Sequence, residues 1–343
     1  MHYVLGVDGG NTKTIALVAA LDGTILGSGR GGCGDIYNAE SPDEPDTAAA
    51  AIANIEYAVT RALRAAGVEA SDLAVSVFNM AGADWPEDIA LLRDAMQVRG
   101  FGRTITVQND ALGILHAALS GNTGVSVVCG SGGATGARAP DGRTWHSSFW
   151  QDQAQGSFHL GQRTLDAVYR SALGIEPPTT LTPRILTFFH AQTVEEVLHL
   201  FTARVRPKHR DLHIDQLTPI LLDEAQAGDL VARGVVLEHG RALGNYALAA
   251  ARKVGIEDTA FSLVLAGGVL RHPSPLLADT IIDTVRHTSP QVRPTRARFE
   301  PIIGVLLNAL EEAGVQIDDA VMERLVPTIP APELFATVLE RSG

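Results

Sequence analysis

A glycine turn between two apolar runs near the start of the sequence governs how this chain can fold. Residues 3–7 and 15–20 are apolar, and between them lie Asp8, two glycines and the polar run Asn11-Thr12-Lys13-Thr14. Two short apolar runs joined by a glycine-containing loop predict a β-hairpin. An ordinary tight turn is the simpler interpretation of the loop alone, because Asp-Gly is the strongest short hairpin signal.

The residue types in this turn also suit a phosphate site. Gly9 and Gly10 lack side chains, so backbone N–H groups there can point at an anion. Thr12, Lys13 and Thr14 can donate to phosphate oxygens, and Asp8 at the strand end can hold a hydrated Mg²⁺. The turn is neither a Walker loop nor a GxGxxG dinucleotide turn, because each of those precedes a helix.

The same pattern returns in the second half of the chain. A strand is expected over 125–129, a turn at Gly130-Ser131-Gly132-Gly133 and a second strand over 134–139. Each turn taken alone is a weak signal. Two such hairpins in two half-chains predict a duplicated fold that holds a nucleotide between its halves.

Alternating helices and strands fill the space between the hairpins and predict an α/β layer. Functional residues of such sheets gather at the carboxyl ends of strands, where Asp8, Asn79, Ala81-Gly82 and Asn109-Asp110 are expected. Asp110 can act as a general base toward a hydroxyl that attacks a phosphoryl group, although helix N-cap is its simpler role.

The rest of the chain is expected to be mainly helical. Helices are expected over 46–66, 84–98, 111–119, 158–173, 194–205, 231–254, 275–286 and 301–313. A buried strand is expected over 262–266, and Gly267-Gly268 after it can let an adenine or ribose lie against the backbone. Close packing of a helix on that strand is the alternative reason for these two glycines.

Charge and cysteine content exclude several classes of protein. The net charge is -12 and the pI about 5.3, which disfavours nonspecific binding to nucleic acid or acidic membranes. Only 2 cysteines occur, too few for a disulfide framework or a zinc site. No signal pattern and no run of about 20 apolar residues is present, so we expect a cytoplasmic protein.

Five motifs in order, DGGNTKT, AGADWPED, QNDA, CGSGG and LAGGV, together resemble the BadF/BadG/BcrA/BcrD ATPase family. That family includes N-acetylglucosamine kinases and lies within the sugar kinase–Hsp70–actin superfamily. The resemblance covers about residues 3–312. It implies two ribonuclease-H-like domains with a central cleft that binds ATP and Mg²⁺, and a helical insertion in the second domain.

The resemblance also implies a division of the chain and of the site. The first domain is expected over 1–119, the second over 120–300, a helix returning to the first over 301–314, and a helical tail over 315–343. The first and second glycine turns would bind the phosphates, Gly267-Gly268 the adenosine, and Asp110 would be the general base. The expected acceptor-binding residues are Asp35, Asn38, Ala81, Gly82, Asp84, Asp110 and Gln155.

Three positions depart from the N-acetylglucosamine kinases that the chain resembles. Ala134 replaces an asparagine that touches the sugar, residues 153–157 replace a GDEGS segment, and Asp35 replaces an asparagine. Loss of hydrogen-bonding partners to a hydroxyl changes discrimination by orders of magnitude. The ATP half therefore matches the family, whereas the acceptor is expected to differ from N-acetylglucosamine.

Three functions remain open at this point. The first is a kinase that uses ATP and Mg²⁺ to phosphorylate a sugar-like small molecule. The second is an ATPase that activates a radical dehydratase or reductase through a cluster shared by two subunits, with Cys33 and Cys129 as ligands. The third is a sensor that binds ATP and a sugar without turnover. Family members are often dimers, so the resemblance implies a homodimer. No nucleic-acid or membrane partner is expected.

Overall fold

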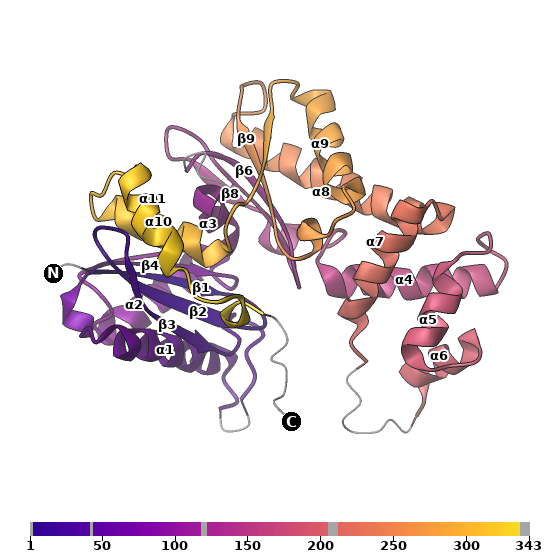
Figure 1. The fold of residues 1–343 in the computed structure, drawn as a ribbon, viewed down its shortest axis with the longest axis horizontal. Helices are drawn as coiled ribbons and strands as arrows, with labels where there is room; N and C mark the ends of the chain where they lie inside the picture. Colours follow the sequence, from indigo (N-terminus) through magenta and orange to yellow (C-terminus); the bar gives the residue numbers. More distant parts are fainter. Residues whose placement is uncertain (1–2, 42–43, 118–121, 205–211, 337–343) are drawn as a thin grey trace.

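Two five-stranded mixed sheets form the framework of the protein, and each carries helices on both faces (Figure 1). The computed structural model describes residues 3–41, 44–117, 122–204 and 212–336. The first sheet comprises β1 (Tyr3–Gly9), β2 (Thr14–Ala20), β3 (Ile25–Gly31), β4 (Leu73–Met80) and β5 (Thr104–Asn109). Its strand order is β3-β2-β1-β4-β5, with β2 antiparallel to both neighbours and β4 parallel to β1 and β5.

The second sheet repeats this order. It comprises β6 (Gly124–Cys129), β7 (Gly133–Arg138), β8 (Thr144–His146), β9 (Ser262–Ala266) and β10 (Arg293–Arg296), arranged β10-β9-β6-β7-β8. Strands β6, β7 and β8 are antiparallel neighbours, and β9 runs parallel to β6 and β10. The duplicated α/β architecture predicted from the two hairpins is therefore confirmed.

Helices cover the first sheet on both faces because the side chains of its strands alternate. Leu5 and Val7 on β1 belong to one core with α1 (Thr47–Ala66) and α2 (Pro86–Val98). Val4 of the same strand points to the opposite face and joins a second core with α10 (Pro301–Glu312) and α11 (Asp319–Leu325). The segment after residue 300 thus completes the first domain, as Figure 1 shows in yellow.

The second sheet shares one of its covering helices with the first domain. Helix α3 (Asp110–Ala117) contacts α10 on one side and β6 and β7 on the other. The longest helix, α8 (Leu230–Val254), packs on the other face of the second sheet and against α9 (Leu276–Thr288). The first residue of α3 therefore lies where the two domains meet.

A helical insertion extends from the second domain, on the right of Figure 1. It consists of α4 (Ser157–Ala172), α5 (Leu181–Phe189), α6 (Val194–Thr202) and α7 (Leu217–Ala227). Two short edge strands, β8 and β10, were not predicted, because Thr-Trp-His and Arg-Pro-Thr-Arg show no apolar alternation. The predicted helix ends at residues 119 and 205, and residues 337–343 of the predicted tail, lie outside the described residues.

Candidate functional site

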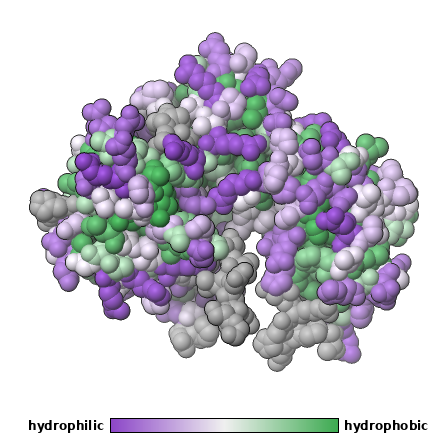
Figure 2. Space-filling view, in the orientation of Figure 1, coloured by the Kyte–Doolittle hydropathy of each residue, from purple (hydrophilic) through white to green (hydrophobic). Residues whose placement is uncertain are grey.

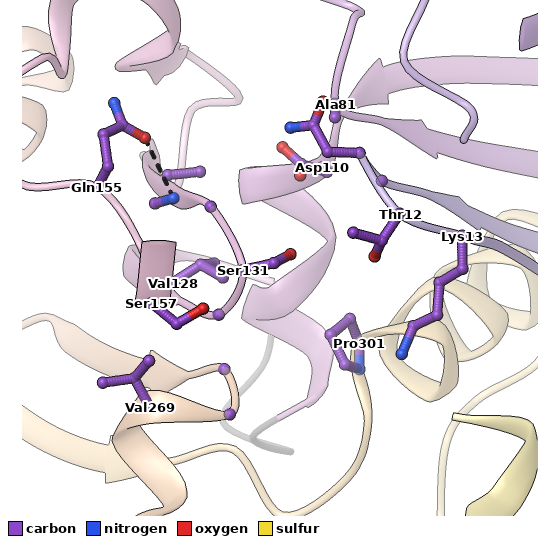
Figure 3. Close-up of a pocket in the computed structure, with 18 of the residues that line it drawn as sticks. Thr12, Lys13, Ala81, Asp110, Val128, Ser131, Gln155, Ser157, Val269 and Pro301 are labelled. Carbon is purple, nitrogen blue, oxygen red and sulfur yellow. Dashed lines mark hydrogen bonds between the residues drawn. The ribbon is translucent and has the colours of Figure 1, made fainter. Parts of the chain in front are cut away.

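A cavity of about 670 Å³ lies between the two domains and is lined by residues of both. Both glycine turns, Gly267-Gly268 and Asp110 contribute to it. Figure 3 shows Thr12 of the first turn and Ser131 of the second on opposite sides, with Asp110 between them. Polar side chains make up most of the face of the molecule that Figure 2 shows.

The first glycine turn connects β1 to β2 and is closed by its own backbone. Gly10 N donates to Lys13 O at 2.9 Å, and Gly34 N donates to Gly10 O at 3.0 Å. Asp8, Gly10, Asn11, Thr12 and Lys13 line the cavity. Two residues expected to bind phosphate lie beneath the turn instead. A Cβ on Gly9 would come within 2.2 Å of the Met80 side chain, and the Thr14 hydroxyl donates to Gly32 O at 2.9 Å.

The second glycine turn connects β6 to β7 and lies against the start of α4. Gly130 N donates to Gly132 O at 2.9 Å, and Ser157 N donates to Gly130 O at 2.7 Å. All four residues of the turn, Gly130 to Gly133, line the cavity. A Cβ built on Gly132 would lie 3.9 Å from Asn11 Nδ2, so the two glycine turns face each other closely enough to hold one polyphosphate.

Gly267 and Gly268 follow β9 and lie next to the second turn. Gly267 has a φ of 106°, and a Cβ there would lie 2.3 Å from the Cys129 carbonyl oxygen. Only glycine fits this position. Gly268 has no atom within 4 Å of its would-be Cβ, which leaves its backbone open to the cavity. The wall continues through Thr218, Leu222, Val269 and His272, so the helical insertion supplies part of this end.

Two carboxylates from the first domain face the middle of the cavity. Asp8 is the last residue but one of β1, and Asp110 begins α3 directly after β5. Burial raises the pKa of Asp8 to about 7, with Lys13 opposing and Glu300 adding to the rise. Burial likewise raises the pKa of Asp110 to about 7, and the neighbouring Asp8 and Asp84 carboxylates add to it. A carboxylate with such a pKa can exchange protons near neutrality.

The acceptor residues predicted around Asp110 form two hydrogen-bonded groups, one around Asp35 and Asn38 and one around Asp84. Asp35 accepts from Tyr37 N at 2.9 Å and from Asn38 Nδ2 at 2.8 Å, and Asn38 also donates to Asn11 Oδ1 at 2.9 Å. Asp84 accepts from Asn109 Nδ2 at 2.9 Å. Asp35, Asn38, Ala81 and Asp84 all line the cavity. Carboxylate and amide groups in this arrangement suit several hydroxyls of a small polar molecule.

Two predicted acceptor residues have other surroundings. Gly82 does not line the cavity, and a Cβ there would lie 2.8 Å from Asp35 Oδ1, so this glycine makes room for Asp35. Gln155 lines the cavity, but its side chain is bonded to protein atoms: Oε1 accepts from Gly133 N at 3.3 Å, as Figure 3 shows, and Nε2 donates to Gln151 O. Gln155 thus supports the second glycine turn.

Several lining residues were not predicted, because no local motif marks them. Arg271 and Glu300 form an ion pair of 2.8 Å at the phosphate end. Ser148 and Phe149 line the acceptor end.

The predicted phosphate residue Lys13 points away from Asp110. Its Nζ donates to the carbonyl of Phe335, and Figure 3 shows the side chain extending toward Pro301 and not toward Asp110. Burial lowers the pKa of Lys13.

The two cysteines do not form a pair in this structure. Cys129 is fully buried at the end of β6, with Sγ 3.7 Å from Gln155 O, and burial raises its pKa to about 12. Cys33 is partly buried in the loop after β3. Within the described ranges, no group of three or more His, Cys, Asp or Glu side chains is arranged to hold a metal ion. No described helix is long and apolar enough to cross a membrane.

Comparison with known proteins identifies the relatives of this chain. Residues 5–309 match the model of the BadF/BadG/BcrA/BcrD ATPase family. An N-acetylmuramic acid/N-acetylglucosamine kinase of Clostridium acetobutylicum is 24% identical over 317 residues, which are 91% of this chain and 99% of the relative. An N-acetyl-D-glucosamine kinase of Dictyostelium discoideum is 24% identical over 319 residues, 89% of this chain and 97% of the relative.

The fold is also found among solved structures. A ROK family glucokinase of Streptomyces griseus, solved with glucose and AMPPNP, superposes with a TM-score of 0.55 at 19% identity. The match covers 90% of this chain and 98% of the glucokinase. The two mixed sheets with their helices therefore form the actin-like ATPase fold of these sugar kinases.

Proposed function

Because this chain belongs to the BadF/BadG/BcrA/BcrD ATPase family, we propose that it is an ATP-dependent kinase that phosphorylates a hydroxyl of a sugar or amino-sugar-like molecule. One observation carries the proposal: both glycine turns, Gly267-Gly268 and Asp110 line a single cavity between the domains. The two relatives named as kinases of N-acetylated amino sugars support the class of acceptor.

Different cavity residues bind different parts of ATP in this proposal. Backbone N–H groups of both turns, with Thr12 and Ser131, bind the phosphates, and Gly268 with the wall from α7 accepts the adenosine. Lys13 and Arg271 supply positive charge near the phosphates. Catalysis rests on positioning the acceptor and neutralising charge on the transferred group.

Asp8 is the residue that fits a magnesium ion. No side-chain hydrogen bond reaches its carboxylate from the described residues, and burial raises its pKa, so a nearby cation would offset the cost of ionisation. Mg²⁺ bound through water at Asp8 would neutralise phosphate charge and orient the terminal phosphoryl group.

Asp110 is positioned to accept the proton of the attacking hydroxyl. It begins α3 and lines the same cavity as the two glycine turns and as Asp35, Asn38 and Asp84. Closure of the domains would exclude water, so that the acceptor hydroxyl and not solvent attacks the phosphoryl group.

Phosphate transfer from ATP to a panel of sugars tests the proposal, with Asp110→Asn as the diagnostic variant. We expect the wild-type protein to phosphorylate at least one N-acetylated or free amino sugar. Asp110→Asn should lower kcat about 10²–10⁴-fold with little change in the KM for ATP. Asp141→Asn, which removes an exposed carboxylate in the turn between β7 and β8, is the control. A near-wild-type rate for Asp110→Asn would exclude this residue as the base.

A further inference from the structure

Ser148 adopts a backbone conformation that is unusual for its residue type. Its φ is 38°, and only two other described non-glycine residues, His190 and His213, have positive φ values. Such conformations are costly and persist where surrounding contacts impose them, often at functional sites. Ser148 follows β8 of the second domain and lines the acceptor end of the cavity.

The Ser148 hydroxyl joins the two domains through Asp84. Ser148 Oγ donates to Asp84 Oδ1 at 2.5 Å, and His146 Nδ1 lies 2.5 Å from the same Oγ. Burial lowers the pKa of His146, which favours the neutral ring. A neutral His146 with its proton on Nδ1 donates to Ser148 Oγ, which leaves the hydroxyl proton for Asp84. The chain of hydrogen bonds therefore runs from His146 through Ser148 to Asp84.

Both described donors to Asp84 bind the same oxygen atom. Asn109 Nδ2 donates to Oδ1 at 2.9 Å, as Ser148 does, and no described residue donates to Oδ2. Two donors from different directions fix the plane of a carboxylate. Oδ2 is thus an oriented acceptor that no described residue uses, on a side chain that lines the cavity and is bonded to Asn109, the neighbour of Asp110.

Phe149 holds the same loop against the first domain. Its ring contacts Tyr37 edge to face, with centroids 5.3 Å apart, and stacks on Trp85 with centroids 6.3 Å apart. Tyr37 precedes Asn38 of the acceptor group, and Trp85 follows Asp84. Aromatic pairs of this geometry contribute beyond the area they bury. The loop from His146 to Phe149 is therefore fastened to the first domain at two adjacent points.

We propose that Ser148 is a positioning residue for the acceptor. It holds Asp84 so that Oδ2 receives a hydrogen bond from an acceptor hydroxyl, and it does so only while the two domains are together. This inference rests on the proposed kinase function, because the acceptor is the molecule whose binding it describes. Acceptor affinity, and not ATP affinity, should then depend on a hydroxyl supplied by the second domain.

The charges around Asp84 give the proposal a pH signature. Asp35, Asp88 and Asp110 face it from the loop after β3, from α2 and from α3, and His146 faces it from β8. Burial raises the pKa of Asp84 to about 6, while hydrogen bonds from Ser148 and Asn109 oppose the rise. Removing the Ser148 hydroxyl should raise this pKa further, so that Asp84 is protonated at higher pH.

Steady-state kinetics of Ser148→Ala and Ser148→Gly provide the test. The acceptor is whichever of N-acetyl-D-glucosamine, N-acetylmuramic acid, D-glucosamine and D-glucose the wild-type protein phosphorylates fastest. We expect both variants to raise the KM for this acceptor about tenfold and to change the KM for ATP less than twofold. The acid limb of kcat/KM for the acceptor should move to higher pH. Ser171→Ala, which removes an exposed hydroxyl at the end of α4, is the matched control.

The glycine variant separates the hydroxyl from the backbone. Glycine adopts a φ of 38° without cost, so Ser148→Gly relieves strain that Ser148→Ala keeps. Acceptor KM near the wild-type value in Ser148→Gly would overturn the proposal, because the hydroxyl would then be dispensable. Equal effects on ATP and acceptor, or an unchanged pH profile, would overturn it too.

A double-mutant cycle measured by urea denaturation tests the hydrogen bond between Ser148 and Asp84 without relying on kinase activity. If the wild-type protein phosphorylates none of these sugars, the kinase proposal fails for them, whereas coupling between Ser148→Ala and Asp84→Ala is still measurable. If the hydrogen bond forms, the double variant should lose less unfolding free energy than the sum of the losses in the two single variants. Additive effects would show that Ser148 does not hold Asp84 and would overturn the inference.

Discussion

Asp8 and Asp110 place two carboxylates in one cavity, and their surroundings oppose ionisation of both at neutral pH. Burial is the main cause for each, and the charge of Asp8 adds to the effect on Asp110. A base with a pKa of about 7 can accept a proton from a hydroxyl and release it again within one catalytic cycle. The energetic cost of this arrangement should be visible in the stability of the ligand-free protein.

Asp110→Asn should stabilise the ligand-free protein at high pH. The folded-state pKa of Asp110 lies above the unfolded value of 3.8, so its contribution is fully present below that value and is lost as pH rises through about 7. Removing the titration should raise the free energy of unfolding by about 1–3 kcal/mol at pH 8 and leave it nearly unchanged at pH 4. Urea denaturation at the two pH values measures this.

The exposed Asp141 provides the control for that comparison. Hydrogen bonds from Arg143 lower its pKa, so Asp141→Asn should give no gain at pH 8. A loss of stability for Asp110→Asn at pH 8 would mean that the ionised carboxylate is well stabilised in the folded protein, contrary to its burial.

At the scale of elements, the crossing of α3 and α10 fixes where Asp110 lies. A Cβ on Gly304 of α10 would come within 2.7 Å of Gly113 O and 2.8 Å of Ala117 N, both backbone atoms of α3. The helices therefore touch backbone to backbone, and neither contact atom can rotate away. The second sheet packs on the opposite side of α3, so any displacement of this helix affects both domains.

Gly304→Ala should lower the free energy of unfolding by about 2–3 kcal/mol, because the added methyl group forces α10 away from α3. Gly234→Ala in α8 is the matched control, since nothing lies within 4 Å of its would-be Cβ. That change should stabilise the protein by about 0.5–1 kcal/mol through helix propensity. Chemical denaturation of both variants measures the difference. Similar gains for the two would contradict the close crossing.

The helices and strands that could be predicted from the sequence are those that a local residue pattern determines. The hairpins at residues 3–20 and 124–138 have apolar runs and glycine turns, and α1 begins after its N-cap Asp46 and ends at Gly67 in the left-handed region. Strands β8 and β10 lack such a pattern, because pairing at the edge of a sheet and not their own residues makes them strands. Their positions come from tertiary structure.

At the scale of the whole molecule, residues 334–336 lie beside the first glycine turn. Arg30 Nη1 donates to Leu334 O and to Ala336 O, each at 2.7 Å, and Lys13 Nζ donates to Phe335 O. Phe335 also lines the cavity. Lys13, which we assign to phosphate binding, thus donates to the Phe335 carbonyl in this structure. Phosphate oxygens of ATP must compete with that carbonyl for the Lys13 ammonium group.

Arg30→Ala should therefore lower the KM for ATP about three- to tenfold with little change in kcat. It removes two of the three side-chain hydrogen bonds that described residues donate to the carbonyl groups of this segment. Arg324→Ala is the control, since Arg324 of α11 lies 3.9 Å from Asp22 in the turn between β2 and β3, and not beside the first glycine turn. Initial rates over a range of ATP concentrations distinguish the two. A higher KM for ATP in Arg30→Ala would show that the segment helps to place Lys13.

Only the site residues that belong to short sequence motifs could be predicted from the sequence. Asp8, Asp110 and the three glycine segments lie at or directly after the ends of strands, and strand ends of one sheet meet at one edge. Ser148 carries no local signal, because its role depends on Asp84 of the other domain. Phe335 is distant from Lys13 in sequence, and Gln155 supports a glycine turn although its position in the motif suggested contact with the acceptor.

The return of α10 to the first sheet has a consequence for how the protein is made. Val4 and Ile15 emerge from the ribosome early, yet the apolar face to which they belong is covered by Ile303 and Leu306 of α10. That face stays exposed until the second domain has been translated and α10 has been synthesised. Contacts over such long sequence separations slow folding and prolong exposure to aggregation. A nascent chain of this architecture therefore exposes the apolar face of its first sheet until α10 has been synthesised.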